Sequence, residues 1–267
     1  MLAAALQIPA TLAVGAEQAM IDYVESMIAA CEFDILVLPQ CMLRESISCV
    51  STMRYWIELS ARKHALVVAG AIEANNRGQF LTTLVAFQGV LWARYVKRYP
   101  EPAESHRFKG GRSHCVVSVP GFLSAVVSAS ELSNIKCTSV FDFPGMAVGL
   151  VSGALAKGSH ALHPSAVAQQ YGIYLICSNL AGSADSRQRT AAFSGYCGVY
   201  GPNGKTLAEP KNGINFCVAD IPAIPRIQRN QSNLWSVMKY EFHTNENFNC
   251  VNTIMSKDGF PSDIPIY

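Results

Sequence analysis

Charged residues are scarce in this chain. Its 267 residues include 21 Lys and Arg and 19 Asp and Glu, which together make up 15% of the sequence, whereas about 25% is usual for a soluble domain. Half of the residues are apolar, which excludes a disordered chain, since disorder requires low hydrophobicity and high charge. The excess of base over acid is only two, so nucleic-acid binding is not expected, because it calls for a clearly basic domain. The composition indicates a globular protein rich in interfaces.

Long hydrophobic runs are absent as well. No stretch approaches the roughly 18 apolar residues of a transmembrane helix, because Gly, Pro, Ser, Asn or Gln recur every few positions. Residues 1–20 end in small residues, as a secretory signal does. They contain no Lys or Arg, the first being Arg44, and Gln7 and Pro9 interrupt the apolar stretch. We therefore expect neither a membrane segment nor a signal peptide.

The sequence also lacks any Cys-x-x-Cys pair. Its nine cysteines, an odd number, lie at positions 31, 41, 49, 115, 137, 177, 197, 217 and 250. This spacing favours neither a zinc site nor a disulfide framework, and a chain of this length has no need of disulfide bonds. We interpret the cysteines as free thiols of a cytoplasmic protein, most of them packed as small hydrophobic side chains. Neither a metal nor an organic cofactor is predicted.

Strand and helix patterns alternate in the first part of the chain, and hairpin signals follow. Strands are expected at 3–8, 33–40, 65–72, 80–87 and 91–96, with helices at 17–31 and 52–63. Further strands are expected at 115–119, 124–129, 137–143, 146–151, 161–163, 173–179, 195–200 and 214–219, with a helix at 165–171. No repeat or low-complexity linker divides the chain. We predict one α/β domain over residues 1–221 and a C-terminal arm over residues 222–267.

A series of short motifs follows this order of elements. Asp34-Ile35-Leu36-Val37-Leu38-Pro39-Gln40 is a strand that ends in Pro-Gln, and Tyr95-Val96-Lys97 closes a later strand. Glu104 precedes Phe108 by four residues and Gly111 by seven. Later landmarks are Asn179-Leu180-Ala181-Gly182, Phe193-Ser194-Gly195-Tyr196-Cys197 and Tyr200-Gly201-Pro202-Asn203-Gly204. In this order the motifs resemble those of the nitrilase superfamily of carbon–nitrogen hydrolases, from Ala5 to about Ile221.

The resemblance implies a four-layer αββα sandwich that assembles, through helices and C-terminal arms, into a homodimer or a larger homo-oligomer. It also implies a chemistry that uses a Cys nucleophile, a Glu general base, a Lys that stabilises the oxyanion, and a second Glu after that Lys. Lys97 and Glu104 match the last two positions. Gln40 stands where the resemblance places the base.

The nucleophile is expected in a strand that reads roughly Gly-x-x-x-Cys-x-Asp and is followed by a long helix. The segment 146–153 resembles that strand and places Gly153 at the cysteine position, with only four residues before Gly158. On this alignment both the nucleophile and most of the following helix are missing. Gln170 and Tyr171 also replace an expected Glu and Asn.

These departures predict a loss of chemistry. Attack on an amide or nitrile carbon needs an activated nucleophile, and an amide side chain such as that of Gln40 cannot serve as a general base. We therefore predict a nitrilase-fold pseudoenzyme that acts through an oligomer, a protein partner or a small amide or carboxylate ligand. The alternative is an amidase-type hydrolase of altered mechanism that retains Lys97 and Glu104.

Some neighbouring residues have two interpretations. Ser152 adjoins Gly153, but on a strand its side chain points to the opposite face. Cys41 lacks a nearby base, which favours a packed thiol. Lys97 and Glu104 form either a residual ion pair or the lining of a pocket that still binds a ligand.

Histidines and basic residues near these motifs are interpreted as structural. His160 and His163 have no Cys, Asp or Glu partner nearby in the sequence, so a metal site is not favoured. Cys197 is interpreted as packing. A cluster of basic residues, interleaved with Glu101 and Glu104, consists of Arg94, Lys97, Arg98, Arg107, Lys109 and Arg112. We interpret this cluster as a solvated loop face and not as a phosphate or nucleic-acid site.

Overall fold

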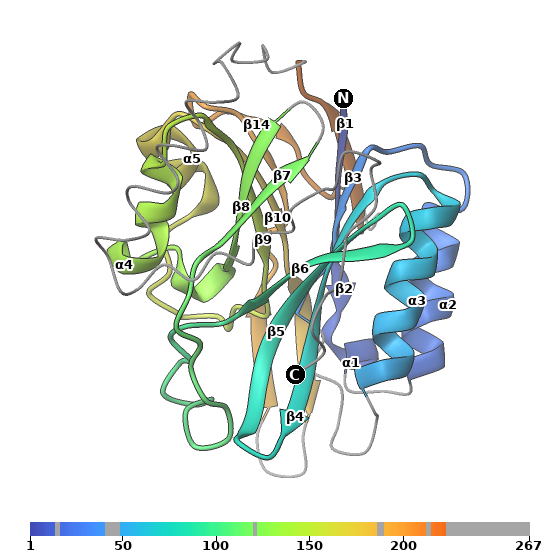
Figure 1. Cartoon of the computed structure of the whole chain (residues 1–267), viewed down its shortest axis with the longest axis vertical. Helices are drawn as coiled ribbons and strands as arrows, with labels where there is room; N and C mark the ends of the chain where they lie inside the picture. The colour runs from blue at the N-terminus through green and yellow to red at the C-terminus, as the bar shows by residue number, and fades with distance from the viewer. Residues whose placement is uncertain (14–16, 41–48, 120–121, 186–189, 212–214, 223–267) are drawn as a thin grey trace, which may run out of the picture.

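Two six-stranded β-sheets lie face to face in the computed structural model of the chain, and helices cover the outer face of each (Figure 1). The structure describes residues 1–13, 17–40, 49–119, 122–185, 190–211 and 215–222. This arrangement confirms the predicted four-layer αββα sandwich. The expected C-terminal arm lies outside the described residues from residue 223 onward.

The first sheet has the strand order β15-β1-β3-β4-β5-β6. Its strands are β1 (Leu2–Leu6), β3 (Ile35–Val37), β4 (Leu66–Asn75), β5 (Gly78–Phe87), β6 (Val90–Val96) and β15 (Phe216–Asp220). The strands β1, β3 and β4 are parallel, and parallel strands need crossover connections. Helices α2 (Glu17–Ile28) and α3 (Cys49–Arg62) provide them.

The second sheet has the order β14-β13-β10-β9-β8-β7. Its strands are β7 (Cys115–Val119), β8 (Phe122–Ser128), β9 (Met146–Ser152), β10 (Tyr174–Ser178), β13 (Gly198–Tyr200) and β14 (Thr206–Ala208). The strands β8, β9 and β10 are parallel, and helix α5 (Pro164–Tyr171) connects the last two. A small third sheet contains β12 (Thr190–Ser194), β11 (Leu180–Asp185) and β2 (Ile8–Pro9), which precedes the short helix α1 (Ala10–Ala13).

The strands predicted at 137–143 and 161–163 are not formed. Residues between β8 and β9 instead make three helical turns: η1 (Ala129–Glu131), α4 (Ile135–Thr138) and η2 (Ser139–Asp142). The side chain of Asn134 caps α4 by accepting a hydrogen bond from the Lys136 N–H, a local interaction that strand periodicity does not anticipate. A helical connection after a strand is therefore present, but it follows β8 rather than β9.

The core that a strand residue enters shows to which face of the sheet its side chain points. The core between the sheets contains Val126 of β8 and Leu150 of β9. The core between the second sheet and its helices contains their neighbours Val127 and Val151. Because successive residues of a strand point to opposite faces, this alternation determines which residues at the strand ends face the opposite sheet.

Six cysteines whose side chains the structure describes are thiols that form no disulfide bond, and all of them except Cys31 are buried: Cys31, Cys115, Cys137, Cys177, Cys197 and Cys217. Burial raises the pKa of the Cys177 thiol well above its ordinary value, as expected for an inert, packed thiol. None of the helices in the described ranges combines the length and apolar composition that crossing a bilayer requires.

Candidate functional site

Three strand ends meet at one edge of the sandwich. Gln40 follows β3, Lys97 follows β6, and Ser128 is the last residue of β8. The Gln40 N–H donates to the carbonyl oxygen of Gly153 in the opposite sheet at 3.0 Å. In open α/β sheets, ligand sites form beyond the carboxyl ends of the strands, so this edge is the candidate site.

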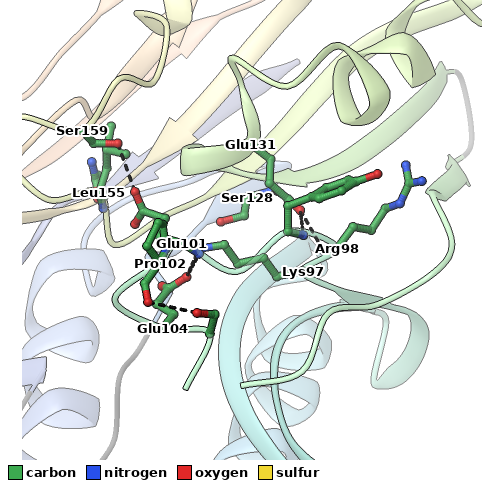
Figure 2. Close-up of polar contacts among 12 residues, drawn as sticks. Lys97, Arg98, Glu101, Pro102, Glu104, Ser128, Glu131, Leu155 and Ser159 are labelled. Carbon is green, nitrogen blue, oxygen red and sulfur yellow. Dashed lines mark hydrogen bonds and ion pairs between the residues drawn. The ribbon is translucent and has the colours of Figure 1, made fainter. Parts of the chain in front are cut away.

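Lys97 and Glu104 form a buried ion pair. The Lys97 ammonium nitrogen lies 2.5 Å from Glu104 Oε2, and the two side chains are 3% and 11% exposed. The same oxygen accepts the Glu101 N–H at 2.8 Å, which anchors the loop that carries the carboxylate (Figure 2). The structure thus brings together the two residues that the motif spacing singled out, and each charge is compensated by the other.

Gln40 is buried at the end of its strand, with 1% of its surface exposed. Its Oε1 atom is buried and has no hydrogen-bond partner among the residues that the structure describes. The backbone of Gly70 approaches so closely that a Cβ atom there would overlap Gln40 Cα. The position is therefore tightly held, and it presents an amide oxygen whose hydrogen-bonding capacity is unused.

Gly153 does not face this site, which corrects its placement at the nucleophile position. A Cβ atom at Gly153 would point into Ala129 Cβ, and Ala129 belongs to the core beneath the helices. A side chain at 153 would thus be directed away from the space between the sheets. No helix lies between the end of β9 and α5, which begins at Pro164, and a helical connection lies after β8.

The sequence analysis missed Ser128. Ser128 pairs in register with Ser152, and Ser152 with Ser178, at the ends of β8, β9 and β10. Val126, two residues before Ser128, lies in the core between the sheets, so Ser128 faces the same side. Its N–H donates to Glu131 Oε2 at 3.0 Å, and Figure 2 labels both residues. A usable signal existed: the spacing Gly-x-x-x-Cys-x-Asp also fits Ser124, Ser128 and Ser130, with serine at all three positions.

Ser152 and Ser178 have other partners. The buried hydroxyl of Ser152 donates to the Leu38 carbonyl at 2.8 Å, and that of Ser178 donates to the Leu6 carbonyl. Both bonds tie the second sheet to the first. Ser152 therefore has a structural role here, while Cys41 lies outside the described residues.

Glu131 is the second residue that sequence patterns did not reveal. It is 1% exposed and accepts four hydrogen bonds. Its Oε2 receives the Tyr95 hydroxyl at 2.6 Å and the Ser128 N–H at 3.0 Å, and its Oε1 receives the N–H groups of Arg98 and Tyr99 at 2.7 and 2.9 Å. One carboxylate thus joins the chain after Lys97 to the end of β8 (Figure 2). Burial, together with Glu131, raises the pKa of Tyr95 well above its ordinary value.

His163 and two members of the basic cluster have local partners. His163 caps α5, with its Nδ1 accepting the Ser165 N–H at 3.2 Å, and burial lowers its pKa. Arg98 contacts the His114 ring and donates to the Lys136 carbonyl at 2.7 Å. Arg107 donates to Gln79 Oε1 at 2.8 Å. Among the described residues, no group of three or more His, Cys, Asp or Glu side chains could hold a metal ion.

Neither a model of any protein family nor any curated protein matches the sequence. Solved structures of an amidase from Nesterenkonia AN1, described as a nitrilase-superfamily protein, are similar. A cysteine-to-alanine mutant has a TM-score of 0.73 and 19% identity, covering 89% of this chain and 97% of that chain. A glutamate-to-glutamine mutant shows Michael addition of acrylamide at its active-site cysteine, with a TM-score of 0.71, 20% identity, and coverage of 89% and 99%. A mutant with both types of substitution, in complex with acrylamide, has a TM-score of 0.71 and 20% identity, covering 89% of this chain and 97% of that chain.

Proposed function

We propose that this chain, which has the fold of nitrilase-superfamily amidases, is a member of that superfamily without carbon–nitrogen hydrolase activity, and that it acts by binding a small amide or carboxylate or a protein partner. The observation that carries the proposal is Gln40. A glutamine at the end of β3 has no basic group that could take a proton from a nucleophile or a water molecule. The catalytic cycle of an amidase requires such a transfer.

Neither nearby carboxylate is free to replace the missing base. Glu104 Oε2 already accepts from the Lys97 ammonium and the Glu101 N–H. Both oxygens of Glu131 accept two hydrogen bonds each. Each carboxylate therefore serves as a charged acceptor that holds neighbouring segments in place, and hydrogen bonds to a charged acceptor are the stronger ones.

The binding part of the proposal rests on unused polarity. Gln40 Oε1 is a buried acceptor without a partner in the described part of the chain. Such an acceptor is unusual in a folded protein, and a ligand N–H would satisfy it. Lys97 offers positive charge at the same edge to a carbonyl or carboxylate oxygen. In the Nesterenkonia amidase, a mutant with glutamine for glutamate and alanine for cysteine still holds acrylamide, which supports binding without turnover here.

Two measurements test the proposal. Ammonia release from a series of short aliphatic amides and nitriles should be indistinguishable from the protein-free control. Butyramide or butyrate should raise the melting temperature, because a ligand that binds only the native state stabilises it. Lys97→Ala should lose that shift, and Lys205→Ala, which alters an exposed lysine, should keep it. Amide or nitrile turnover that Lys97→Ala abolishes would contradict the proposed inactivity. An unchanged melting temperature with both butyramide and butyrate would contradict the proposed binding of a small ligand.

A hydrolase of altered mechanism is the second candidate, and the retained Lys97–Glu104 pair favours it. Buried ion pairs add little to stability on average and often mark functional sites. This candidate predicts turnover that Glu104→Gln lowers as strongly as Lys97→Ala. Equal, background-level ammonia release by the wild type and both variants would exclude it.

We also propose a cytoplasmic homo-oligomer, a dimer or larger. Large apolar side chains lie on the surface, including Ile135 and Leu162, which are 62% and 44% exposed, and contacts between subunits would cover such groups. Light scattering coupled to size-exclusion chromatography tests this, and a monomer at micromolar concentration would contradict it.

A further inference from the structure

Two buried cysteines meet in the space between the two sheets. Cys217 lies in β15, and Cys197 directly precedes β13. Both belong to the core between the sheets, and their exposed fractions are 3% for Cys197 and 6% for Cys217. Because β13 and β15 belong to different sheets, the two thiols come from opposite layers of the sandwich, although they are only 20 positions apart in the sequence.

The alternation of side chains along each strand explains this orientation. Val199, two residues after Cys197, lies in the same core, whereas Tyr200 lies in the core beneath the helices. Ala219, two residues after Cys217, also lies between the sheets. Residues two positions apart on a strand share a face. The backbone of each strand therefore directs its cysteine side chain towards the opposite sheet.

The two thiols are in direct contact. The Cys197 thiol donates a hydrogen bond to the Cys217 sulfur, and the Cys217 thiol donates to the Ala5 carbonyl at 3.7 Å. Cys177, a third cysteine of this region, lies in the core beneath the helices, and its thiol donates to the Tyr196 carbonyl at 3.1 Å. Cys197 and Cys217 are thus already arranged thiol against thiol, while Cys177 faces the other side of its sheet.

We propose that Cys197 and Cys217 form a modification site, at which hydrogen peroxide converts the two thiols into a disulfide bond that links the two sheets. Antibody domains join the two sheets of their sandwich by a buried disulfide in the same way. In a reducing compartment such bonds are usually transient and often serve redox sensing, so the thiol form is the resting state. The pair includes neither Gln40 nor Lys97, and its oxidation is independent of the proposed function.

The oxidation has two steps. The Cys217 sulfur bonds to one oxygen of hydrogen peroxide, the O–O bond breaks, and the thiol proton leaves with the second oxygen as water, so that a sulfenic acid remains. The Cys197 sulfur then bonds to the Cys217 sulfur, the S–O bond breaks, and the hydroxyl leaves with the Cys197 proton as a second water. The two thiols supply the two electrons that reduce the peroxide.

Cys217 is the thiol that reacts first. The hydrogen bond from Cys197 lowers the pKa of Cys217, whereas burial and the same hydrogen bond raise the pKa of Cys197. The thiolate is the form that attacks, so the sulfur with the lower pKa takes the first step. Cys217 is also the more exposed of the two, which favours its contact with a small oxidant.

Peptide mass mapping without reductant tests the pairing. Trypsin cuts after Lys205 and Lys211, so the two cysteines fall on separate peptides, 190–205 and 212–226. After treatment of the native protein with hydrogen peroxide, we expect these two peptides to be joined and to separate again with dithiothreitol. Treatment that leaves the two peptides unlinked, or that joins either of them to a different cysteine peptide, overturns the proposal.

A comparison of stability shows what the link does. A disulfide restricts the unfolded chain, so the urea midpoint of the oxidised wild type should exceed that of the reduced form and return to it with dithiothreitol. Cys217→Ser should show no such rise, whereas Cys31→Ser, the matched control at a partly exposed thiol, should keep it. If Cys217→Ser does not fold, the two forms of the wild type decide alone. An oxidised midpoint no higher than the reduced one overturns the proposed link between the sheets.

Discussion

Replacing Glu131 by Gln tests how the two sheets are joined at the site. The change keeps the size of the side chain and converts one carboxylate oxygen into an NH₂ donor. If that NH₂ replaces Oε1, the N–H groups of Arg98 and Tyr99 both lose their acceptor. If it replaces Oε2, the hydroxyl of Tyr95 can turn to accept from it, and the Ser128 N–H alone is left unpaired.

The second orientation costs less and sets the expected magnitude. One buried unpaired donor costs about 1–3 kcal/mol, and the remaining bonds also weaken because they are no longer made to a charged acceptor. We expect Glu131→Gln to lower the free energy of unfolding by about 1–3 kcal/mol or more. The change is measured as a reduced midpoint of urea denaturation with an unchanged slope.

A double-mutant cycle with Tyr95→Phe checks the origin of the effect. Because the two side chains share a hydrogen bond of 2.6 Å, their effects should be non-additive by about 0.5–3 kcal/mol. A Glu131→Gln variant as stable as the wild type would refute the reasoning that this carboxylate is the acceptor for four donors.

Three further predictions follow from burial and packing. Gly153→Ala should lower the free energy of unfolding by about 1–3 kcal/mol, because its Cβ would overlap Ala129 Cβ; an unchanged urea midpoint would contradict this packing. Burial, and to a lesser degree a nearby arginine, lower the pKa of His114 from 6.5 to about 4. The unfolded chain therefore takes up this proton at higher pH, so stability should fall as the pH is lowered from 6.5 towards 4, and His114→Gln should flatten that dependence in urea titrations. Cys177, fully buried with a raised pKa, should resist alkylation in the native protein while the partly exposed Cys31 reacts; labelling of both at the same rate would show that the core opens easily.

The sequence predicted much of the architecture because the relevant signals are local. Alternating apolar residues and short buried runs identified most strands of both sheets, and the helical stripe of residues 17–31 identified α2. The spacing from Lys97 to Glu104 lies within one loop, so the pair could be anticipated. The strand predicted at 137–143 failed because a run containing Cys137, Val140 and Phe141 is equally apolar in a helical turn that packs on the sheet.

By itself the sequence predicted the αββα sandwich, placed Gln40 where the resemblance expects the base, and supplied a lysine and a glutamate for one ion pair. The tertiary structure alone decided which strand end faces them. Ser128 ends β8, and Gly153 comes one residue after the end of the neighbouring parallel strand β9. A shift of one residue along a strand turns a side chain to the other face of the sheet. Only the register between strands shows that Ser128 faces the opposite sheet, whereas a Cβ atom at Gly153 would point into Ala129. The role of Glu131 was hidden because three of its four donors, Tyr95, Arg98 and Tyr99, lie more than 30 residues earlier in the sequence, and no local pattern connects them to it.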